Sequence, residues 1–309
     1  MKQRVYIIVG PTAVGKSEVA LLVAEKLDAC IISADSRQIY KGMDIGTAKP
    51  NEAERSRVNH LLIDIVEPDH VFSAAEFMDS CIKAINQTFE NGKNALIVGG
   101  TGLYIRALTE GFDLANTPRI DEIHDELTDR FEKHGLDDLV KELLELDPIA
   151  VSEIDTNNPH RVIRALEIVK STGKPLNESR GKEKPSGIEF QIVGLRRDRS
   201  ELSERISQRT YAMIDAGWLD EVRELMKLGL DESSPAMSGI GYYELRQYLN
   251  GEMTLDDAIE KIIIRTRQYA KRQMTWFNRE ENIHWIDLES GDQPEITAEQ
   301  IIRHLGGLV

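Results

Sequence analysis

The sequence predicts an α/β protein with a parallel sheet, helices on both faces of that sheet, and a helical domain inserted into the chain. Over residues 1–110, short apolar runs alternate with amphipathic helical patterns, as they do in βα units. A glycine-rich turn directly follows the first apolar run. After about Pro118 the pattern changes, because two helical stripes follow one another without a strand between them. These observations favour a sheet that the chain leaves and later rejoins.

The expected elements follow in chain order. The predicted strands are short apolar runs, at Val5 to Val9, Cys30 to Ser33, Leu61 to Ile65, Ala95 to Val98 and Phe190 to Leu195. Helical patterns run to Leu27 and from about Ala74 to Asn91. In the insertion the apolar stripes are Leu136, Leu139, Val140, Leu143 and Leu144, and then Val162, Leu166 and Val169. The last predicted strand is expected to rejoin the sheet, and helices to fill the rest of the chain.

Three segments follow from these patterns. Residues 1–115 form the first part of the α/β core, residues 116–188 form the helical insertion, and residues 189–309 form the second part of the core with basic C-terminal helices. Gly173 to Pro175 and Lys184 to Gly187 are rich in turn-forming residues and mark the end of the insertion. The sequence contains no internal repeat and no low-complexity tract.

Composition and charge exclude several classes of protein. No apolar run approaches the roughly 18 residues that span a bilayer, and no signal peptide is present, so we expect a cytoplasmic protein with no membrane partner. Two separated cysteines argue against a disulfide framework or a zinc site. The net charge of −15 disfavours a polyanionic partner on average. Residues 262–279 nevertheless contain five basic residues and no acidic one, which is compatible with a local basic surface.

Residues 10–17 read GPTAVGKS and match the phosphate-binding pattern GxxxxGK[ST] in every fixed position. The two glycines permit a tight turn in which backbone N–H groups point at phosphate oxygens, and the following helix adds its positive end. Lys16 is expected to reach the outer phosphate, and the Ser17 hydroxyl to bind Mg²⁺. The sequence thus predicts a P-loop NTPase-like sheet and a diphosphate held by Gly10, Pro11, Thr12, Ala13, Val14, Gly15, Lys16 and Ser17. The motif recognises phosphates and does not require a nucleotide.

Ligands of an open parallel sheet lie beyond the carboxyl ends of its strands, so the residues that follow each strand are candidates for chemistry. Asp35 follows the second predicted strand, and it either caps a helix, binds magnesium through water, or acts as a general base. Thr101 lies between glycines after the fourth strand, either as a turn residue or as a residue that faces the loop. Arg205 and Arg209 share one helix face and are either solvated charges or cations that close on a diphosphate.

Residues 265–279 combine basic and aromatic side chains. Arg265, Arg272 and Arg279 recur at heptad spacing, with Tyr269 and Trp276 between them. This pattern suits a nucleic acid backbone together with an unstacked base. It suits equally well an amphipathic helix whose aromatic residues are core and whose charges are solvated.

Seven sequence blocks in order resemble the bacterial tRNA dimethylallyltransferase family, also called the tRNA isopentenyltransferase or IPP transferase family. They are GPTAVGKS at 10, DSRQIYKGMDIGTAKP at 35, FSAAEF at 72, VGGTGLYIRAL at 98, NPHRVIRALE at 158, SGIGYYEL at 238 and TRQYAKRQMTWF at 266. The resemblance covers nearly the whole chain. It implies transfer of a dimethylallyl group from dimethylallyl diphosphate, with Mg²⁺, to the exocyclic N6 amine of the adenosine 3′ to the anticodon.

The resemblance also implies roles for individual residues. Asp35 takes the proton of the amine, Thr101 helps to position the reacting groups, and Arg209 stabilises the leaving diphosphate. Contacts with the tRNA anticodon stem-loop are implied for Asp35, Ser36, Arg37, Gln38, Thr101, Pro159, His160, Arg161, Val162, Ile163, Ile240, Gly241, Tyr242, Gln247, Arg272, Gln273, Met274, Thr275, Trp276, Phe277 and Arg279. The insertion would hold the stem by shape and phosphates. Position 124 is His where some relatives have Arg, so that contact is not carried over.

Other functions stay open on sequence alone. A P-loop kinase of a small metabolite would explain residues 1–110 but not the insertion or the basic aromatic helix. Prenyl transfer to free AMP or ATP would need no large RNA-holding domain. A non-catalytic RNA-binding protein is disfavoured by the intact Lys16 and Ser17. Eukaryotic relatives in this family often carry a C-terminal zinc finger, which the two separated cysteines of this chain cannot form, so the chain resembles the compact bacterial members. We expect it to act as a monomer.

Overall fold

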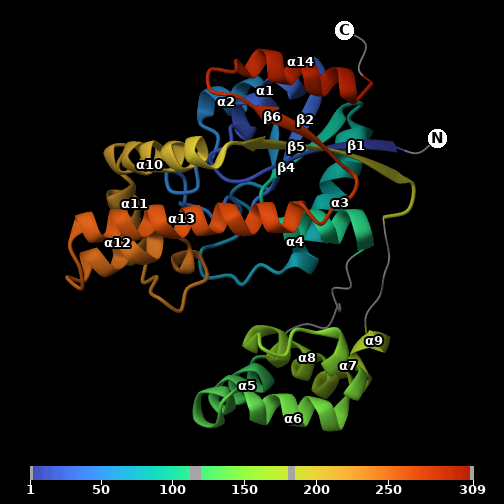
Figure 1. Ribbon diagram of the computed structural model, residues 1–309, viewed down its shortest axis with the longest axis vertical. Helices are drawn as coiled ribbons and strands as arrows, with labels where there is room; N and C mark the ends of the chain where they lie inside the picture. Colours follow the sequence, from blue (N-terminus) through green and yellow to red (C-terminus); the bar gives the residue numbers. More distant parts are fainter. Residues whose placement is uncertain (1–2, 112–119, 180–184, 307–309) are drawn as a thin grey trace. The chain divides into compact units, whose positions relative to one another are not determined.

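The computed structural model of the chain describes residues 3–111, 120–179 and 185–306 (Figure 1). The chain divides into two compact units. The first contains Met1–Ile105 and Pro185–Val309, and the second contains Arg106–Lys184. The expected boundary between residues 115 and 116 lies outside the described residues, as does Lys184 of the expected linker. The first unit is thus made of two separate stretches of chain, and the second unit lies between them in sequence.

The first unit is built on a parallel sheet whose strand order is β3-β2-β4-β1-β5-β6. The strands are β1 (Gln3–Val9), β2 (Ala29–Ala34), β3 (His60–Leu61), β4 (Asn94–Gly99), β5 (Ile188–Arg197) and β6 (Ile283–Leu288). Val9 is in register with Gly99 of β4 and with Gly194 of β5. The chain therefore rejoins the sheet, as predicted; the structure places the rejoining strand beside β1, and the carboxyl ends of β4, β1 and β5 meet.

Two strands differ from the sequence prediction. The strand expected at Leu61 to Ile65 ends at Leu61, because Leu62 and Asp64 have φ angles of 61° and 57° and the extended backbone cannot continue through them. The prediction that helices alone follow β5 is wrong, because β6 pairs with β5 at the edge of the sheet. Strand β6 reads IHWIDL, in which polar residues interrupt the apolar run, as befits an edge strand.

Helices cover both faces of this sheet. On one face Ile8 and Leu96 share a core cluster with residues of α1 (Lys16–Lys26) and α14 (Pro294–His304), which pack against each other (Figure 1). Side chains alternate along a strand, so the buried neighbours of Ile8 and Leu96 point to the opposite face. Helix α3 (Ala74–Glu90) packs against β2 and β4. The expected α/β architecture is confirmed.

The remaining helices of the first unit shape the site at the carboxyl ends of the strands. They are α2 (Glu52–Arg57), α4 (Gly102–Arg106), α10 (Arg199–Asp215), α11 (Trp218–Lys227), α12 (Tyr242–Leu249) and α13 (Leu255–Phe277), with a 3₁₀ turn at Ala236–Ser238. Helix α4 continues into a π-helical turn at Ala107–Gly111, which belongs to the second unit. A second apolar cluster joins α11, α12 and α13 to Met43. Within the described residues, none of the helices is both long and apolar enough to cross a membrane.

The second unit is helical in its described part. Its helices are α5 (Asp121–His134), α6 (Leu136–Leu146), α7 (Pro148–Glu153), α8 (Pro159–Thr172) and α9 (Leu176–Ser179). Both predicted stripes contribute to its core, which contains Leu139, Leu143, Val162 and Leu166. Leu144 is the exception, because its side chain is 50% exposed. One residue beyond Leu143 turns the side chain about 100° around the helix, away from the core.

Candidate functional site

The glycine-rich loop follows β1 and ends where α1 begins at Lys16. Gly10 and Gly15 have φ angles of 151° and 110°, which favour glycine. A Cβ atom at Gly10 would lie 2.5 Å from the carbonyl oxygen of Leu195, so no other residue fits there without a shift. Ala13 also has a positive φ, of 64°. The loop therefore has the tight turn that the motif predicts, directly before a helix N-terminus.

Lys16 lies over this loop. Its Nζ donates hydrogen bonds to the carbonyl oxygens of Gly10 and Pro11, both at 2.8 Å. Burial lowers the pKa of Lys16 to about 7; the charge of Asp35 raises it and the charge of Arg209 lowers it further. An anion in the loop would favour the protonated amine, so this lysine is suited to bind one.

Three arginines approach the same loop. Arg205 Nε donates to the carbonyl oxygen of Ala13 at 2.9 Å, and Arg209 Nη1 donates to Thr12 Oγ1 at 3.3 Å. Burial lowers the pKa of Arg209, an effect that Asp35 opposes and Arg205 increases. The sequence prediction missed Arg197, the last residue of β5. Its Nε donates a hydrogen bond to the carbonyl oxygen of Val14 at 3.0 Å.

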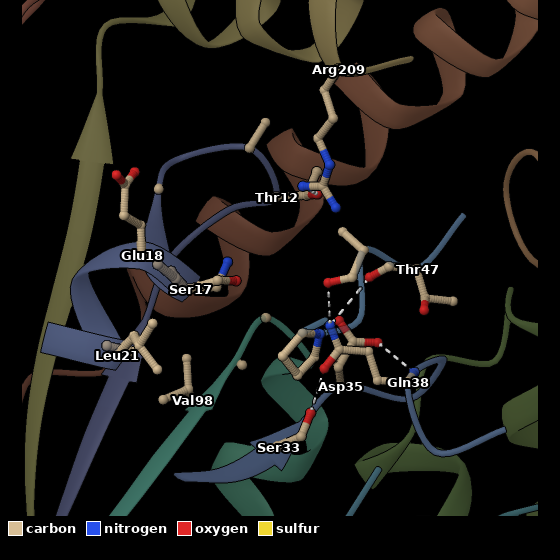
Figure 2. A pocket seen from close by; sticks show the side chains of 18 of the residues that line it. Thr12, Ser17, Glu18, Leu21, Ser33, Asp35, Gln38, Thr47, Val98 and Arg209 are labelled. Carbon is tan, nitrogen blue, oxygen red and sulfur yellow. Dashed lines mark hydrogen bonds between the residues drawn. The ribbon is translucent and has the colours of Figure 1, made fainter. Parts of the chain in front are cut away.

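A pocket of about 500 Å³ opens beside the loop at the carboxyl ends of the strands. In Figure 2, Thr12 and Arg209 face Asp35, Gln38 and Thr47 across this space. Lys16, Ser17 and Arg205 also line the pocket. Cationic groups on one wall thus face a carboxylate on the other.

Asp35 shapes the turn after β2. Its Oδ1 accepts hydrogen bonds from the backbone N–H groups of Arg37, at 2.8 Å, and of Gln38, at 3.4 Å. Among the described residues, no side chain or backbone group donates to its Oδ2. Residues 36–39 form a turn and not a helix, so Asp35 caps this turn in place of the helix considered from the sequence, and its second oxygen is still available for chemistry. The catalytic role stays a prediction.

Thr101 is tied to the same turn. Its Oγ1 accepts the backbone N–H of Ser36 at 3.1 Å. Tyr269, which lines the pocket, lies next to Thr101; burial and the charge of Asp35 raise its pKa to about 12, and a hydrogen bond with Thr101 lowers it. Tyr269 therefore stays a neutral phenol at physiological pH. These contacts place Thr101 beside Asp35, whereas its predicted part in positioning a substrate remains untested.

Two of the predicted RNA contacts are engaged within the protein. The Gln38 side chain accepts the Ser33 hydroxyl at 2.9 Å and donates to the carbonyl oxygens of Thr47 and Ala48, both at 3.2 Å. Arg37 donates to the carbonyl oxygen of Pro235 at 2.7 Å and to Ser238 Oγ at 3.3 Å. In this structure both side chains hold the turn that carries Asp35.

Gln273 of α13 has a similar internal role. Its side chain is buried, its Oε1 accepts the N–H of Thr12 at 2.8 Å, and its Nε2 donates to the carbonyl oxygen of Gly100 at 2.9 Å. A Cβ atom at Gly100 would lie 2.2 Å from that nitrogen. Gln273 was predicted as a tRNA contact, but its amide joins the phosphate loop to the segment that leads into Thr101.

Several other predicted tRNA contacts are core residues. Val162 and Ile163 are buried in the second unit, and Tyr242 and Phe277 are buried in the first. Gly241 provides room for packing, because a Cβ atom there would lie 1.9 Å from the ring of Trp218. Side-chain contacts with RNA are therefore not supported at these positions. Periodicity could have found them, since each lies on the apolar face of its helix or at its start.

The other residues predicted to contact tRNA are at least partly accessible, and for them the contact stays a prediction. Arg272, Thr275 and Arg279 are exposed, as are His160 and Arg161 at the start of α8. Half-buried residues complete this group, namely Ser36, Pro159, Ile240, Gln247, Met274 and Trp276.

The basic stretch at residues 262–279 remains compatible with RNA binding. The guanidinium of Arg272 lies 5.8 Å from the ring centre of Tyr269, so a cation sits against an aromatic face.

His124, for which no tRNA contact was carried over from the family, is engaged within the second unit. Its Nδ1 hydrogen bonds to the buried Glu167, and Arg164 Nη1 donates to the other carboxylate oxygen of Glu167 at 2.9 Å.

The fold and the loop define the class of protein: a P-loop α/β protein with a polar pocket at the carboxyl ends of its strands. Residues 38–280 match the family model described as IPP transferase. The chain belongs to this family.

Relatives match over almost the whole length. A protein named tRNA dimethylallyltransferase from Alkaliphilus oremlandii is 43% identical over 99% of this chain and 98% of its own. A protein of the same name, numbered 2, from Geotalea daltonii is 45% identical over 91% of this chain and 86% of its own.

Solved structures agree with this assignment. The full-length tRNA isopentenylpyrophosphate transferase of Bacillus halodurans has a TM-score of 0.73 at 37% identity and covers 99% of this chain and 96% of its own. A eukaryotic dimethylallyltransferase, solved while acting on tRNA, has a TM-score of 0.82 at 27% identity, over 96% of this chain and 77% of its own.

Proposed function

We propose that this protein transfers a dimethylallyl group from dimethylallyl diphosphate to the exocyclic N6 amine of the adenosine 3′ to the anticodon in tRNA, releasing diphosphate. Full-length similarity to proteins named tRNA dimethylallyltransferase supports the reaction class. One structural observation carries the proposal further: Lys16 of the phosphate loop, Arg209 and the Asp35 carboxylate line one pocket, and Arg209 faces Asp35 across it (Figure 2). The cations suit a leaving diphosphate and the carboxylate suits an amine that loses a proton.

The diphosphate would bind at the loop. Backbone N–H groups and Lys16 would hold its oxygens, while Arg205 and Arg209 would neutralise the charge that develops as it leaves. The Ser17 hydroxyl fits a magnesium ligand, because it is exposed at the pocket and Mg²⁺ commonly takes one or two protein oxygens together with phosphate oxygens and water. When bound, Mg²⁺ would supply further charge neutralisation on the diphosphate.

The amine would lose its proton to Asp35. An adenine N6 amine is a poor nucleophile, because its lone pair is delocalised into the ring. As the N6–C1 bond forms and the C1–oxygen bond of the diphosphate breaks, Asp35 Oδ2 would accept the proton, and the electron pair of the broken bond would leave with the diphosphate. Oδ1 would meanwhile keep the turn in place through Arg37 and Gln38.

The proposal extends to the partner and the setting. The exposed basic residues of α13 would contact the phosphates of the anticodon stem-loop, and the target base would leave its stack to reach the pocket. We also propose that a single copy of the chain is sufficient, because the pocket is lined by residues of one unit. We propose the cytoplasm as the setting of the reaction.

One experiment tests the proposal against its rivals. Purified protein, Mg²⁺ and labelled dimethylallyl diphosphate are mixed with unmodified tRNA in one tube and with AMP in another. Label in tRNA alone would support the proposal, and its position at N6 is read by nucleoside mass spectrometry. Label in AMP would favour a free-nucleotide prenyltransferase. Label in neither, together with ATP-dependent phosphorylation of a metabolite, would favour a kinase.

A further inference from the structure

We infer that Glu221 is a positioning residue for prenyl transfer, an inference that rests on the proposed function. Glu221 lies in the first turn of α11. Its Oε2 accepts the backbone N–H groups of Asp44, at 2.7 Å, and Ile45, at 2.6 Å. Its Oε1 accepts the N–H of Gly46 at 3.1 Å and the hydroxyl of Tyr242 at 2.6 Å. One carboxylate therefore binds three consecutive backbone N–H groups and a phenol.

Such an arrangement controls the position of a loop. Residues 41–50 form neither helix nor strand, so their N–H groups have no regular ladder of partners. A carboxylate accepts hydrogen bonds only, and bonds to a charged acceptor are shorter and stronger than neutral ones. Three adjacent donors converge on Glu221, so this one side chain satisfies the backbone N–H groups of residues 44–46, whereas the carbonyl oxygens of Asp44 and Ile45 accept from Lys49 and Ala48 within the loop.

Packing fixes the same loop to α11. The ring of Trp218, in the same helical turn as Glu221, fills the space that glycines leave open. A Cβ atom at Gly46 would lie 2.0 Å from Trp218 Nε1, and one at Gly241 would lie 1.9 Å from Trp218 Cη2. The loop therefore rests on α11 through both an apolar contact and the carboxylate.

The loop in turn connects Glu221 to the pocket. Thr47 and Ala48, which follow the anchored residues, line the pocket, and their carbonyl oxygens accept both hydrogen bonds of the Gln38 amide. The backbone N–H of Gln38 donates to Asp35 Oδ1. A continuous set of contacts thus runs from Glu221 to the proposed general base. Glu221 is not among the residues that line the pocket, so it would act through the loop.

The test replaces one acceptor oxygen and keeps the size of the side chain. In Glu221→Gln an NH₂ group replaces one carboxylate oxygen, and this group cannot accept the hydrogen bonds that the backbone N–H groups donate. We expect kcat for tRNA prenylation to fall at least about tenfold, because small displacements of a catalytic group are costly. KM for dimethylallyl diphosphate and Kd for tRNA should change less than about threefold, since the phosphate loop and α13 are not attached to Glu221. The amides of Asp44, Ile45 and Gly46 should exchange with deuterium faster.

A matched control separates positioning from stability. Glu224→Gln lies on the same helix at an exposed site, where Glu224 pairs only with Lys227 within the described residues, and it should leave kcat and amide exchange unchanged. Melting temperatures are recorded for every variant. If Glu221→Gln does not fold, Glu221→Asp is measured by the same criteria. Asp keeps the negative charge, but its side chain is one methylene shorter, so the carboxylate lies farther from the loop.

The outcomes are distinct. A variant with faster amide exchange, or a lower melting temperature, and an unchanged kcat would show that Glu221 is structural only and would overturn the inference. Unchanged exchange at residues 44–46 would also overturn it. Wild-type protein that does not prenylate tRNA would overturn the proposed function, and the exchange data would still show whether Glu221 holds the loop.

Discussion

Asp35 both stabilises a turn and faces the pocket, and one substitution separates these roles. In Asp35→Asn the amide oxygen can still accept the N–H groups of Arg37 and Gln38, so the turn should persist. An amide cannot take up a proton, so we expect turnover to fall by roughly 10² to 10⁴ with little change in tRNA affinity. The measurement is single-turnover prenylation beside a tRNA binding titration. Equal activity in the variant would remove Asp35 from the mechanism.

Lys16 gives a pH prediction. Its pKa of about 7 in the ligand-free protein is held down by burial, so above pH 7 most molecules have a neutral amine. A bound diphosphate raises this pKa again, and binding therefore takes up a proton. Below about pH 7 Lys16 is already protonated, so affinity for dimethylallyl diphosphate should not change with pH through this group, and above pH 7 it should weaken by up to about tenfold per pH unit.

Calorimetry checks this sign directly. Titrations at pH 8 in two buffers of different ionisation enthalpy give the number of protons taken up on binding. We expect wild type to take up about half to one proton more than Lys16→Arg, whose guanidinium stays charged. Equal uptake in the two proteins would mean that Lys16 is already protonated, contrary to the prediction.

At the scale of elements, the sequence was informative where a feature is contiguous. The apolar run, glycine turn and helix at residues 5–27 are adjacent, so the phosphate loop was predicted in full. The edge strand β6 was missed, because its polar residues conceal the strand pattern. Contacts between distant elements could not be predicted at all. The bond from Thr12 to Gln273 joins residues 261 positions apart, and no local pattern encodes it.

Gln273 yields a prediction about α13 as an element. Gln273→Met keeps the length of the side chain but leaves the N–H of Thr12 and the carbonyl of Gly100 without their partner. Stability should fall by about 1–3 kcal/mol, and KM for dimethylallyl diphosphate should rise at least about fivefold, because the phosphate loop loses its support. Denaturant unfolding and steady-state kinetics measure the two effects.

The same variant decides between two roles for Gln273. If Gln273 supports the phosphate loop only, tRNA affinity of Gln273→Met should stay within about twofold of wild type. If Gln273 contacts a base, the substitution should weaken tRNA binding by about 1–3 kcal/mol. Gln268→Met is the matched control, because Gln268 is exposed on the same helix. Weaker tRNA binding with unchanged KM for dimethylallyl diphosphate would restore the original assignment as an RNA contact.

For the whole molecule, the distribution of charge matters more than its sum. A net charge of −15 would repel tRNA if it were spread evenly. The five basic residues between 262 and 279 are all exposed, however, and only part of their charge is met locally, by Glu244 at Arg265, so that over a Debye length of about 10 Å they outweigh the more distant acids. Binding of tRNA should therefore strengthen as salt is lowered, despite the overall charge.

A comparison of two arginines tests this placement. Arg272→Ala removes an exposed cation of α13, and we expect the slope of log K against log salt to become shallower by about one, so that the loss of affinity is larger at low salt. Arg303→Ala removes a cation that is 66% exposed on α14 and changes the net charge equally. If charge acted through its sum, both variants would weaken binding alike. A loss confined to Arg272→Ala would show that tRNA responds to the local surface, whereas a salt-independent loss would indicate a folding defect instead.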